Sequence, residues 1–177
     1  SGLWQQRASA EGSEDRGRYV QRARRRKKSR SRCCLSEAAA DDAKAGAGKK
    51  EVLLEILEEK GERNVVLVDL SKEDWSEAVE DAFRYGKVVF ASSTYNMEIF
   101  TPMRNLLLNL KEKNYQNKIV GLIENGTWAP NSAKCMKEIL STMKNIDIIE
   151  PVVTIKSKLS EENCLQLYKM AEDLIKK

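Results

Sequence analysis

Short apolar runs alternate with amphipathic helical patterns along residues 49–177, and this alternation limits the possible folds more than any other feature of the sequence. Three of the runs, at residues 64–70, 87–91 and 118–123, are rich in Val, Ile and Leu. Such runs are typical of strands that are covered on both faces. Strands that alternate with helices of this length favour right-handed crossovers and a parallel sheet. The sequence therefore predicts an α/β sandwich with helices on both faces of a mostly parallel sheet.

Capping residues and glycines predict where the helices begin and end. The first helix is expected at residues 49–60, because Gly61 follows it at a position typical of a helix C-terminus. The expected N-terminal caps of the later helices are Ser71 (with Asp74), Thr101 (followed by Pro102), Asn131 and Ser160. Residues 146–155 are expected to form an edge strand that Pro151 interrupts, since proline cannot donate to a sheet ladder.

Residues 1–48 differ in composition from the rest of the chain. They carry 12 basic and 6 acidic residues, net +6, whereas residues 49–177 carry 19 and 21, net −2. A segment poor in aliphatic residues and rich in Arg, Ser, Ala and Gly cannot offset its ordering entropy, so a disordered tail is expected. Its basic run at residues 21–32 is either a solvated run without a partner or a phosphate-binding or localisation segment. The run has no aromatic residue to stack on bases, which argues against specific nucleic-acid binding.

Several classes of protein are excluded by what the chain lacks. It contains no His, so Ser–His and Cys–His nucleophile pairs and His-ligated metal sites are excluded. No apolar run approaches the roughly 18 residues that span a bilayer, and the first thirty residues hold no apolar stretch of a secretory signal. The four cysteines are expected to be reduced thiols in the cytoplasm; they are Cys33, Cys34, Cys135 and Cys164. We therefore expect a cytoplasmic protein without a membrane segment or a metal site.

Two polar segments, at residues 92–98 and 124–130, follow consecutive predicted strands. In parallel sheets, ligands bind at the carboxyl ends of the strands where the strand order reverses, so both segments are expected to contribute to one site. Together they offer two aromatic surfaces and many neutral donors and acceptors, with little positive charge. This lining suits a flat, hydrogen-bonding, redox-active ring better than a phosphate or a metal. Ordinary β–α turns with surface aromatics remain the alternative.

The same two segments resemble motifs of a known family. Residues 91–96 read Ala-Ser-Ser-Thr-Tyr-Asn, and residues 100–103 and 106–108 continue with Phe-Thr-Pro-Met and Leu-Leu-Leu. Residues 118–130 read Lys-Ile-Val-Gly-Leu-Ile-Glu-Asn-Gly-Thr-Trp-Ala-Pro. Both resemble the flavin loops of the flavodoxin-like domain of flavodiiron proteins, also called A-type flavoproteins, and the resemblance extends over about residues 50–177. It implies a flavodoxin fold that binds FMN. One side of the isoalloxazine would be lined by Ser92, Ser93, Thr94, Tyr95 and Asn96, and the other by Asn125, Gly126, Thr127 and Trp128.

The resemblance implies an electron-transfer flavoprotein rather than a self-sufficient enzyme. Flavodiiron proteins reduce oxygen or nitric oxide at a diiron centre in a His-rich domain, which this chain lacks. Its partner would be a redox protein, with a diiron-containing domain on another chain as the candidate. Glu98 and Glu124 would disfavour a negatively charged reduced flavin if they lie within a Debye length of the ring. A cofactor-free, flavodoxin-shaped scaffold module with a basic tail is the alternative, and nucleic-acid association through the tail is a third interpretation.

The sequence departs from a flavodoxin at its front end. A flavodoxin begins with a strand and a Ser/Thr-rich loop that cradles the FMN phosphate at a helix N-terminus. Residues 33–48 contain neither a β-branched run nor a Ser/Thr cluster, and residues 45–49 are expected to be a flexible joint. We therefore expect a fold that is incomplete at the first strand, with residues 1–48 as a tail and residues 49–177 as the flavodoxin-like domain. The loss would leave two neighbouring strand edges unpaired.

Overall fold

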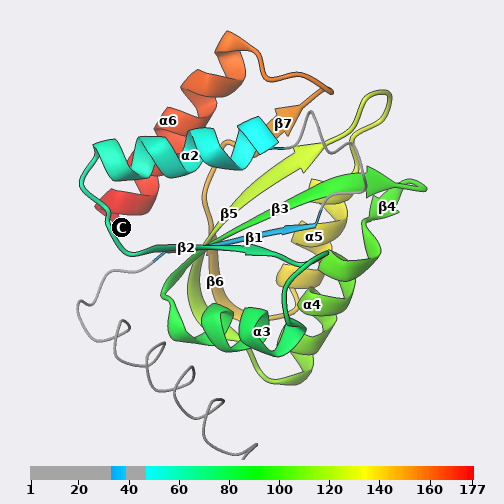
Figure 1. Ribbon diagram of the computed structural model, residues 1–177. Helices are drawn as coiled ribbons and strands as arrows, with labels where there is room; N and C mark the ends of the chain where they lie inside the picture. The colour runs from blue at the N-terminus through cyan, green and yellow to red at the C-terminus, as the bar shows by residue number, and fades with distance from the viewer. Residues whose placement is uncertain (1–32, 39–46) are drawn as a thin grey trace, which may run out of the picture. The chain divides into compact units, whose positions relative to one another are not determined.

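The structure is a computed structural model that describes residues 33–38 and 47–177 (Figure 1). Its strands are β1 (Cys33–Ala38), β2 (Val65–Asp69), β3 (Lys87–Tyr95), β4 (Glu98–Ile99), β5 (Gln116–Asn125), β6 (Lys144–Ile148) and β7 (Val153–Ile155). Its helices are α2 (Ala47–Glu59), α3 (Trp75–Arg84), α4 (Thr101–Glu112), α5 (Ser132–Leu140) and α6 (Glu161–Lys176). Every helix in these residues is too short or too polar to cross a lipid bilayer.

The strands form one sheet in the order β2-β1-β3-β5-β6. All neighbours along this order are parallel. The two-residue strand β4 pairs antiparallel with β3, and β7 pairs parallel with β5 beyond β6. The strand order reverses direction at β1, because the chain moves outward to β2 and then returns to β3 on the other side. Such a reversal is where ligands bind in open α/β sheets.

Helices cover both faces of the sheet (Figure 1). Helices α2 and α6 lie on one face, and α3, α4 and α5 lie on the other. The apolar run of strand β3 contributes side chains to the hydrophobic cores on both faces of the sheet. Val88 and Phe90 pack in the core under α3 to α5, and Val89 packs in the core under α2 and α6. Alternate side chains of a strand point to opposite faces, so a continuous apolar run is needed here. The predicted three-layer α/β sandwich is confirmed.

The expectation that the first strand is missing is wrong. Strand β1 lies between β2 and β3, and Leu35 stands opposite Leu67 on one side and Val89 on the other. Its sequence, Cys-Cys-Leu-Ser-Glu-Ala, contains no β-branched residue, so its own composition gives a weak strand signal. The pairing on both edges determines its conformation, because β2 and β3 would otherwise carry unpaired backbone groups. The sheet therefore begins before the expected boundary at residue 49. The flexible joint expected at residues 45–49 is wrong for residues 47–49, which begin helix α2. The rest of that joint and the disorder predicted for the rest of the tail lie outside the described residues.

The edge strand is interrupted, as expected. Strands β6 and β7 both pair with β5, and the residues between them include a cis peptide bond at Glu150–Pro151. Ser160 caps α6, as predicted, in a capping box with Asn163.

Helices α3 and α4 begin differently from the prediction. The expected cap of α3, Ser71, donates to the Asp69 carboxylate at 2.6 Å, and Asp74 caps the helix by accepting from the Ser76 nitrogen at 2.8 Å. At α4 the cap position is Phe100, and Thr101 is the first helical residue. The observed cap lies three residues after the predicted one at α3 and one residue before it at α4, so both helices form where they were expected with a small shift of the cap.

Candidate functional site

The two polar segments lie at the same edge of the sheet, at the carboxyl ends of β3 and β5. These strands are parallel neighbours, and Ser92 stands opposite Glu124 while Ser93 stands opposite Asn125. Strand β1 ends beside them, because Ala38 stands opposite Ser92 on the other side of β3. The structure therefore brings both segments to the point where the strand order reverses.

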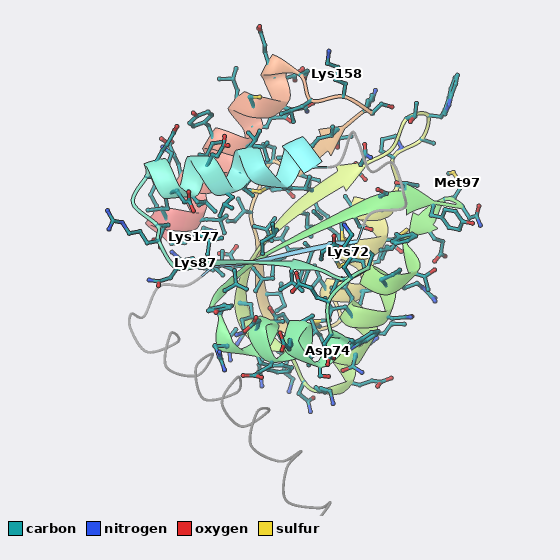
Figure 2. The ribbon with its side chains drawn as sticks, in the orientation of Figure 1. Lys72, Asp74, Lys87, Met97, Lys158 and Lys177 are labelled. Atoms are coloured by element: carbon teal, nitrogen blue, oxygen red, sulfur yellow. The ribbon has the colours of Figure 1, made fainter. Side chains whose placement is uncertain are left out.

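The first segment is a hairpin rather than an open loop. Strand β3 continues to Tyr95, turns at Asn96 and Met97, and returns in β4 (Figure 2). The turn residues have φ values of 49° and 63°, as a two-residue hairpin turn requires. Asn tolerates this left-handed conformation, whereas Met97 is strained in it. The turn exposes 53% of Tyr95 and 59% of Met97, and the Tyr95 and Phe100 rings form a T-shaped pair with their centroids 6.2 Å apart.

Strand geometry divides the side chains of this segment between the two faces. Thr94 faces α5, and its Oγ1 accepts hydrogen bonds from the backbone nitrogens of Asn131 (2.9 Å) and Ser132 (3.1 Å). Ser92 is buried, and its Oγ donates to the Ser93 carbonyl at 3.2 Å. Ser93 and Tyr95 lie on the opposite face by alternation. Thr94 and Ser92 therefore support the edge, and Ser93, Tyr95 and the exposed Asn96 are left to face a ligand.

The second segment is held at its start and exposed at its tip. The Gly126 nitrogen donates to the Ile155 carbonyl at 3.1 Å, and a Cβ at Gly126 would lie 2.9 Å from the Pro130 Cα. The Thr127 hydroxyl pairs with that of Ser157 at 2.8 Å. Trp128 is 95% exposed, so its ring is free to stack on a ligand.

Asn125, the last residue of β5, carries an unsatisfied hydrogen-bond acceptor. Its Oδ1 atom is buried and has no hydrogen-bond partner within the described part of the chain. Buried side-chain oxygens nearly always accept a hydrogen bond from protein, water or ligand. Asn125 therefore offers an acceptor to a donor group bound at this edge.

The two carboxylates of the segments have different environments. Glu98 is exposed and forms an ion pair with Arg104 at 3.4 Å. Glu124 is only 7% exposed; its Oε2 accepts from the Ala133 nitrogen at 2.9 Å, and its Oε1 accepts from the Thr154 hydroxyl at 2.8 Å. Glu124 is thus a buried, fully hydrogen-bonded group and not a solvated loop carboxylate.

The cap of α5 is the feature that sequence reasoning missed. Asn131 occupies the cap position but makes no capping hydrogen bond with its side chain, whose Nδ2 donates to the Met97 carbonyl at 2.7 Å. Thr94 and Glu124 accept the N-terminal backbone hydrogens of α5 in its place. Thr94 lies 37 residues away along the chain, so no local pattern could have revealed it.

The Cys135 thiol, whose Sγ accepts from the Asn131 side chain at 3.4 Å, is not activated. Burial, followed by the charges of Glu138 and Glu98, raises the pKa of Cys135 above its ordinary value, which favours the protonated thiol. The part of the chain that the structure describes contains no group of three or more acidic or Cys side chains arranged to hold a metal ion. The exposed rings and neutral hydrogen-bonding groups of this edge suit a planar, hydrogen-bonding ligand.

No family model matches the sequence, and no curated protein is significantly similar to it. Solved structures do match. Rubredoxin oxygen:oxidoreductase from Desulfovibrio gigas has a TM-score of 0.72 at 23% identity, over 90% of this chain and 38% of that one. The Flv1 flavodiiron core from Synechocystis has a TM-score of 0.70 at 14% identity, over 91% of this chain and 40% of that one. A Fusobacterium nucleatum flavodoxin bound to flavin mononucleotide has a TM-score of 0.59 at 12% identity, over 83% of this chain and 98% of that one.

The chain thus spans 38% to 40% of the two flavodiiron chains, and it matches nearly the whole length of the flavodoxin. At these identities the likeness is one of fold, and it agrees with the strand order β2-β1-β3-β5-β6. The chain has the flavodoxin fold, and it resembles the flavodoxin-like domain of flavodiiron proteins.

Proposed function

We propose that this chain binds FMN at the carboxyl edge of β1, β3 and β5 and serves as an electron-transfer domain. The observation that carries the proposal is the pairing of the two polar segments at the strand-order reversal, with Ser93 opposite Asn125 and the Tyr95 and Trp128 rings exposed. Ring surfaces and neutral polar groups at this position fit a flat heteroaromatic ligand.

The residues that would hold FMN fall into two groups. Tyr95 and Trp128 would stack on the ring, and Asn125 would accept a hydrogen bond from it through the unsatisfied Oδ1. Ser93, Asn96, Thr127 and the backbone at Gly126 would provide further polar contacts, while Ser92 and Thr94 would support them from the α5 side. Bound FMN would supply one- and two-electron redox chemistry.

The electrons would pass to a partner redox centre. The chain contains no His and matches only the smaller part of the two flavodiiron chains, so a diiron-type centre would have to lie in another domain or on another chain. Cys135 and Cys164 are free thiols, which suits the reducing cytoplasm, and we include that location in the proposal.

The absorption spectrum of the purified full chain tests the proposal. We expect a yellow protein with flavin bands and close to one FMN per chain, or a colourless protein that takes up one equivalent of added FMN. A chain that is folded by circular dichroism yet takes up no FMN would overturn the proposal. That result would favour a cofactor-free, flavodoxin-shaped interaction module.

A further inference from the structure

We propose that Glu124 is a positioning residue that fixes the second cofactor segment and places a buried negative charge beside the FMN ring site, which lowers the midpoint potential of the bound cofactor. This inference rests on the proposed function. It assigns different electrostatic roles to Glu98 and Glu124, which the sequence analysis treated alike.

Glu124 closes the base of the second segment. It precedes Asn125 at the end of β5, and its Oε2 accepts the backbone hydrogen of Ala133 in the first turn of α5, 2.9 Å away. The exposed tip at Trp128 lies between these two anchor points. One side chain therefore sets the spacing between the strand that enters the segment and the helix that leaves it.

The other carboxylate oxygen extends this connection to the neighbouring elements. Oε1 accepts from the Thr154 hydroxyl of β7 at 2.8 Å, and the Thr154 carbonyl accepts from Asn163 Nδ2 of α6 at 2.9 Å. The same part of β7 binds the Gly126 nitrogen through the Ile155 carbonyl. Glu124 thus joins β5, β7 and α5 beneath the segment.

Glu124 is buried, so solvent screens its charge only weakly. Each of its carboxylate oxygens accepts a hydrogen bond, Oε2 from the Ala133 nitrogen and Oε1 from the Thr154 hydroxyl. Within residues 47–177 Glu124 forms no ion pair with Lys or Arg, and the N-terminal dipole of α5 opposes its charge. Glu98, by contrast, is exposed and paired with Arg104, so its charge is strongly screened.

A buried negative charge next to the ring site opposes further negative charge there. Reduction of a bound flavin increases electron density on the ring, so Glu124 favours the oxidised form relative to the reduced one. A lower potential would make the chain a better electron donor to its partner centre.

Glu124→Gln removes the charge and can keep both hydrogen bonds. The Gln carbonyl oxygen can accept from Ala133, and its NH₂ group can donate to the Thr154 oxygen after the hydroxyl rotates. The matched control is Glu98→Gln, which removes a carboxylate of the other segment. The measurements are the midpoint potential of the FMN-loaded full chain and the FMN dissociation constant in the oxidised state.

We expect E124Q to strengthen the binding of reduced FMN relative to oxidised FMN by about tenfold. This ratio corresponds to a rise of about 30 mV in the midpoint potential of a two-electron couple. E98Q should shift the same ratio by less than about twofold. Glu124→Ala removes the hydrogen bonds as well, and it should weaken binding of oxidised FMN by about tenfold while E124Q leaves it near the wild-type value.

An unchanged potential in E124Q, or equal shifts in E124Q and E98Q, would overturn the electrostatic role in a chain that still binds FMN. If E124A and wild type bind oxidised FMN equally well, the positioning role is wrong; if E124A does not fold, E124Q still decides the electrostatic role. Wild-type chain that takes up no FMN would instead overturn the proposed function and this inference with it.

Discussion

The Thr94 hydroxyl oxygen lies 2.9 Å from the backbone nitrogen of Asn131, so the end of β3 caps the N-terminus of α5. The same oxygen accepts from the Ser132 nitrogen, and the Asn131 side chain donates back to the Met97 carbonyl in the hairpin turn. Because α5 follows directly on the second segment, these bonds tie the two candidate cofactor segments to one helix terminus. A change in one segment should therefore affect the position of the other.

Thr94→Val keeps the shape of the side chain and removes its acceptor. Two backbone hydrogens of α5 then lose their partner, and we expect the free energy of unfolding to fall by about 1–2 kcal/mol, as for loss of a helix cap. Urea denaturation measures the change. Thr94→Ser keeps the hydroxyl and should lie within about 0.5 kcal/mol of wild type.

Thr127→Val is the matched control, because Thr127 is exposed and its hydroxyl is paired with Ser157 on the surface. It should leave the free energy of unfolding unchanged to within about 0.5 kcal/mol. Equal unfolding midpoints for T94V and T127V would show that the Thr94 hydroxyl does not stabilise α5.

Gly126→Ala tests the close approach within the second segment. The new Cβ would lie 2.9 Å from the Pro130 Cα and 3.3 Å from its nitrogen, and both are backbone atoms that cannot rotate away. We expect a loss of about 1–3 kcal/mol in the free energy of unfolding and weaker FMN binding, because the segment must open.

Gly86→Ala provides the comparison, since a Cβ there meets nothing within 4 Å. It should be neutral or stabilising by up to about 1 kcal/mol, because alanine restricts the unfolded chain. A G126A protein that is as stable as G86A and binds FMN normally would contradict the packing described here.

The fold was predictable wherever residues were buried on both faces. The runs at β3 and β5 are apolar at successive positions because Val88 and Phe90 pack on one core and Val89 on the other. Strand β1 was missed because its conformation depends on pairing with β2 and β3, which lie far from it in the sequence. Pairing of that kind leaves little trace in the composition of a six-residue strand.

The candidate site was predictable in position and not in orientation. The sequence places Thr94 and Tyr95 in one polar segment, and only the strand geometry shows that Thr94 faces α5 while Tyr95 is exposed. The cap that Glu124 provides for α5 could not be predicted either, because its partner is the backbone of Ala133 and not a recognisable side chain. Local patterns report which residues follow a strand, whereas their contacts depend on the whole sheet.

Trp128→Ala should weaken FMN binding without changing stability. The side chain is 95% exposed, so its removal costs the folded protein almost no packing. Loss of one stacking surface should raise the FMN dissociation constant by about tenfold, as for aromatic stacking on a heterocycle. Fluorescence titration with FMN and urea denaturation measure the two effects.

The control for W128A is Tyr168→Ala, an aromatic side chain 42% exposed on α6 that lies beside Lys60 and not at the candidate site. Its removal should leave the FMN dissociation constant unchanged. If the two variants bind FMN with the affinity of wild type, the Trp128 ring takes no part in the site.

The phosphate of FMN should contribute little to affinity in this chain. In flavodoxins the segment between the first strand and the following helix holds the phosphate. Here residues 39–46 read Ala-Ala-Asp-Asp-Ala-Lys-Ala-Gly, with no Ser or Thr and with two acidic residues against one basic. We expect riboflavin and FMN to bind within about tenfold of each other. Isothermal titration with the two ligands measures the ratio, and FMN binding about a hundredfold tighter than riboflavin would contradict the prediction.

Asp74, the N-terminal cap of α3, should make the free energy of unfolding depend on pH in the acidic range. The side chain and then the backbone N–H of Ser76 donate hydrogen bonds that lower the pKa of the Asp74 carboxyl below its ordinary value of 3.8. A carboxyl whose pKa is lower in the folded than in the unfolded chain stabilises the fold above its unfolded pKa, and this contribution is lost as the pH falls through the folded pKa. The wild type should therefore lose stability below about pH 4 more steeply than Asp74→Asn, which keeps an acceptor oxygen but cannot titrate. Urea denaturation of both proteins from pH 7 to pH 2.5 gives the difference between their free energies of unfolding. The contributions of the other acidic groups are common to both proteins and cancel in this difference. A difference that does not change with pH would show that the Asp74 charge does not contribute to the cap.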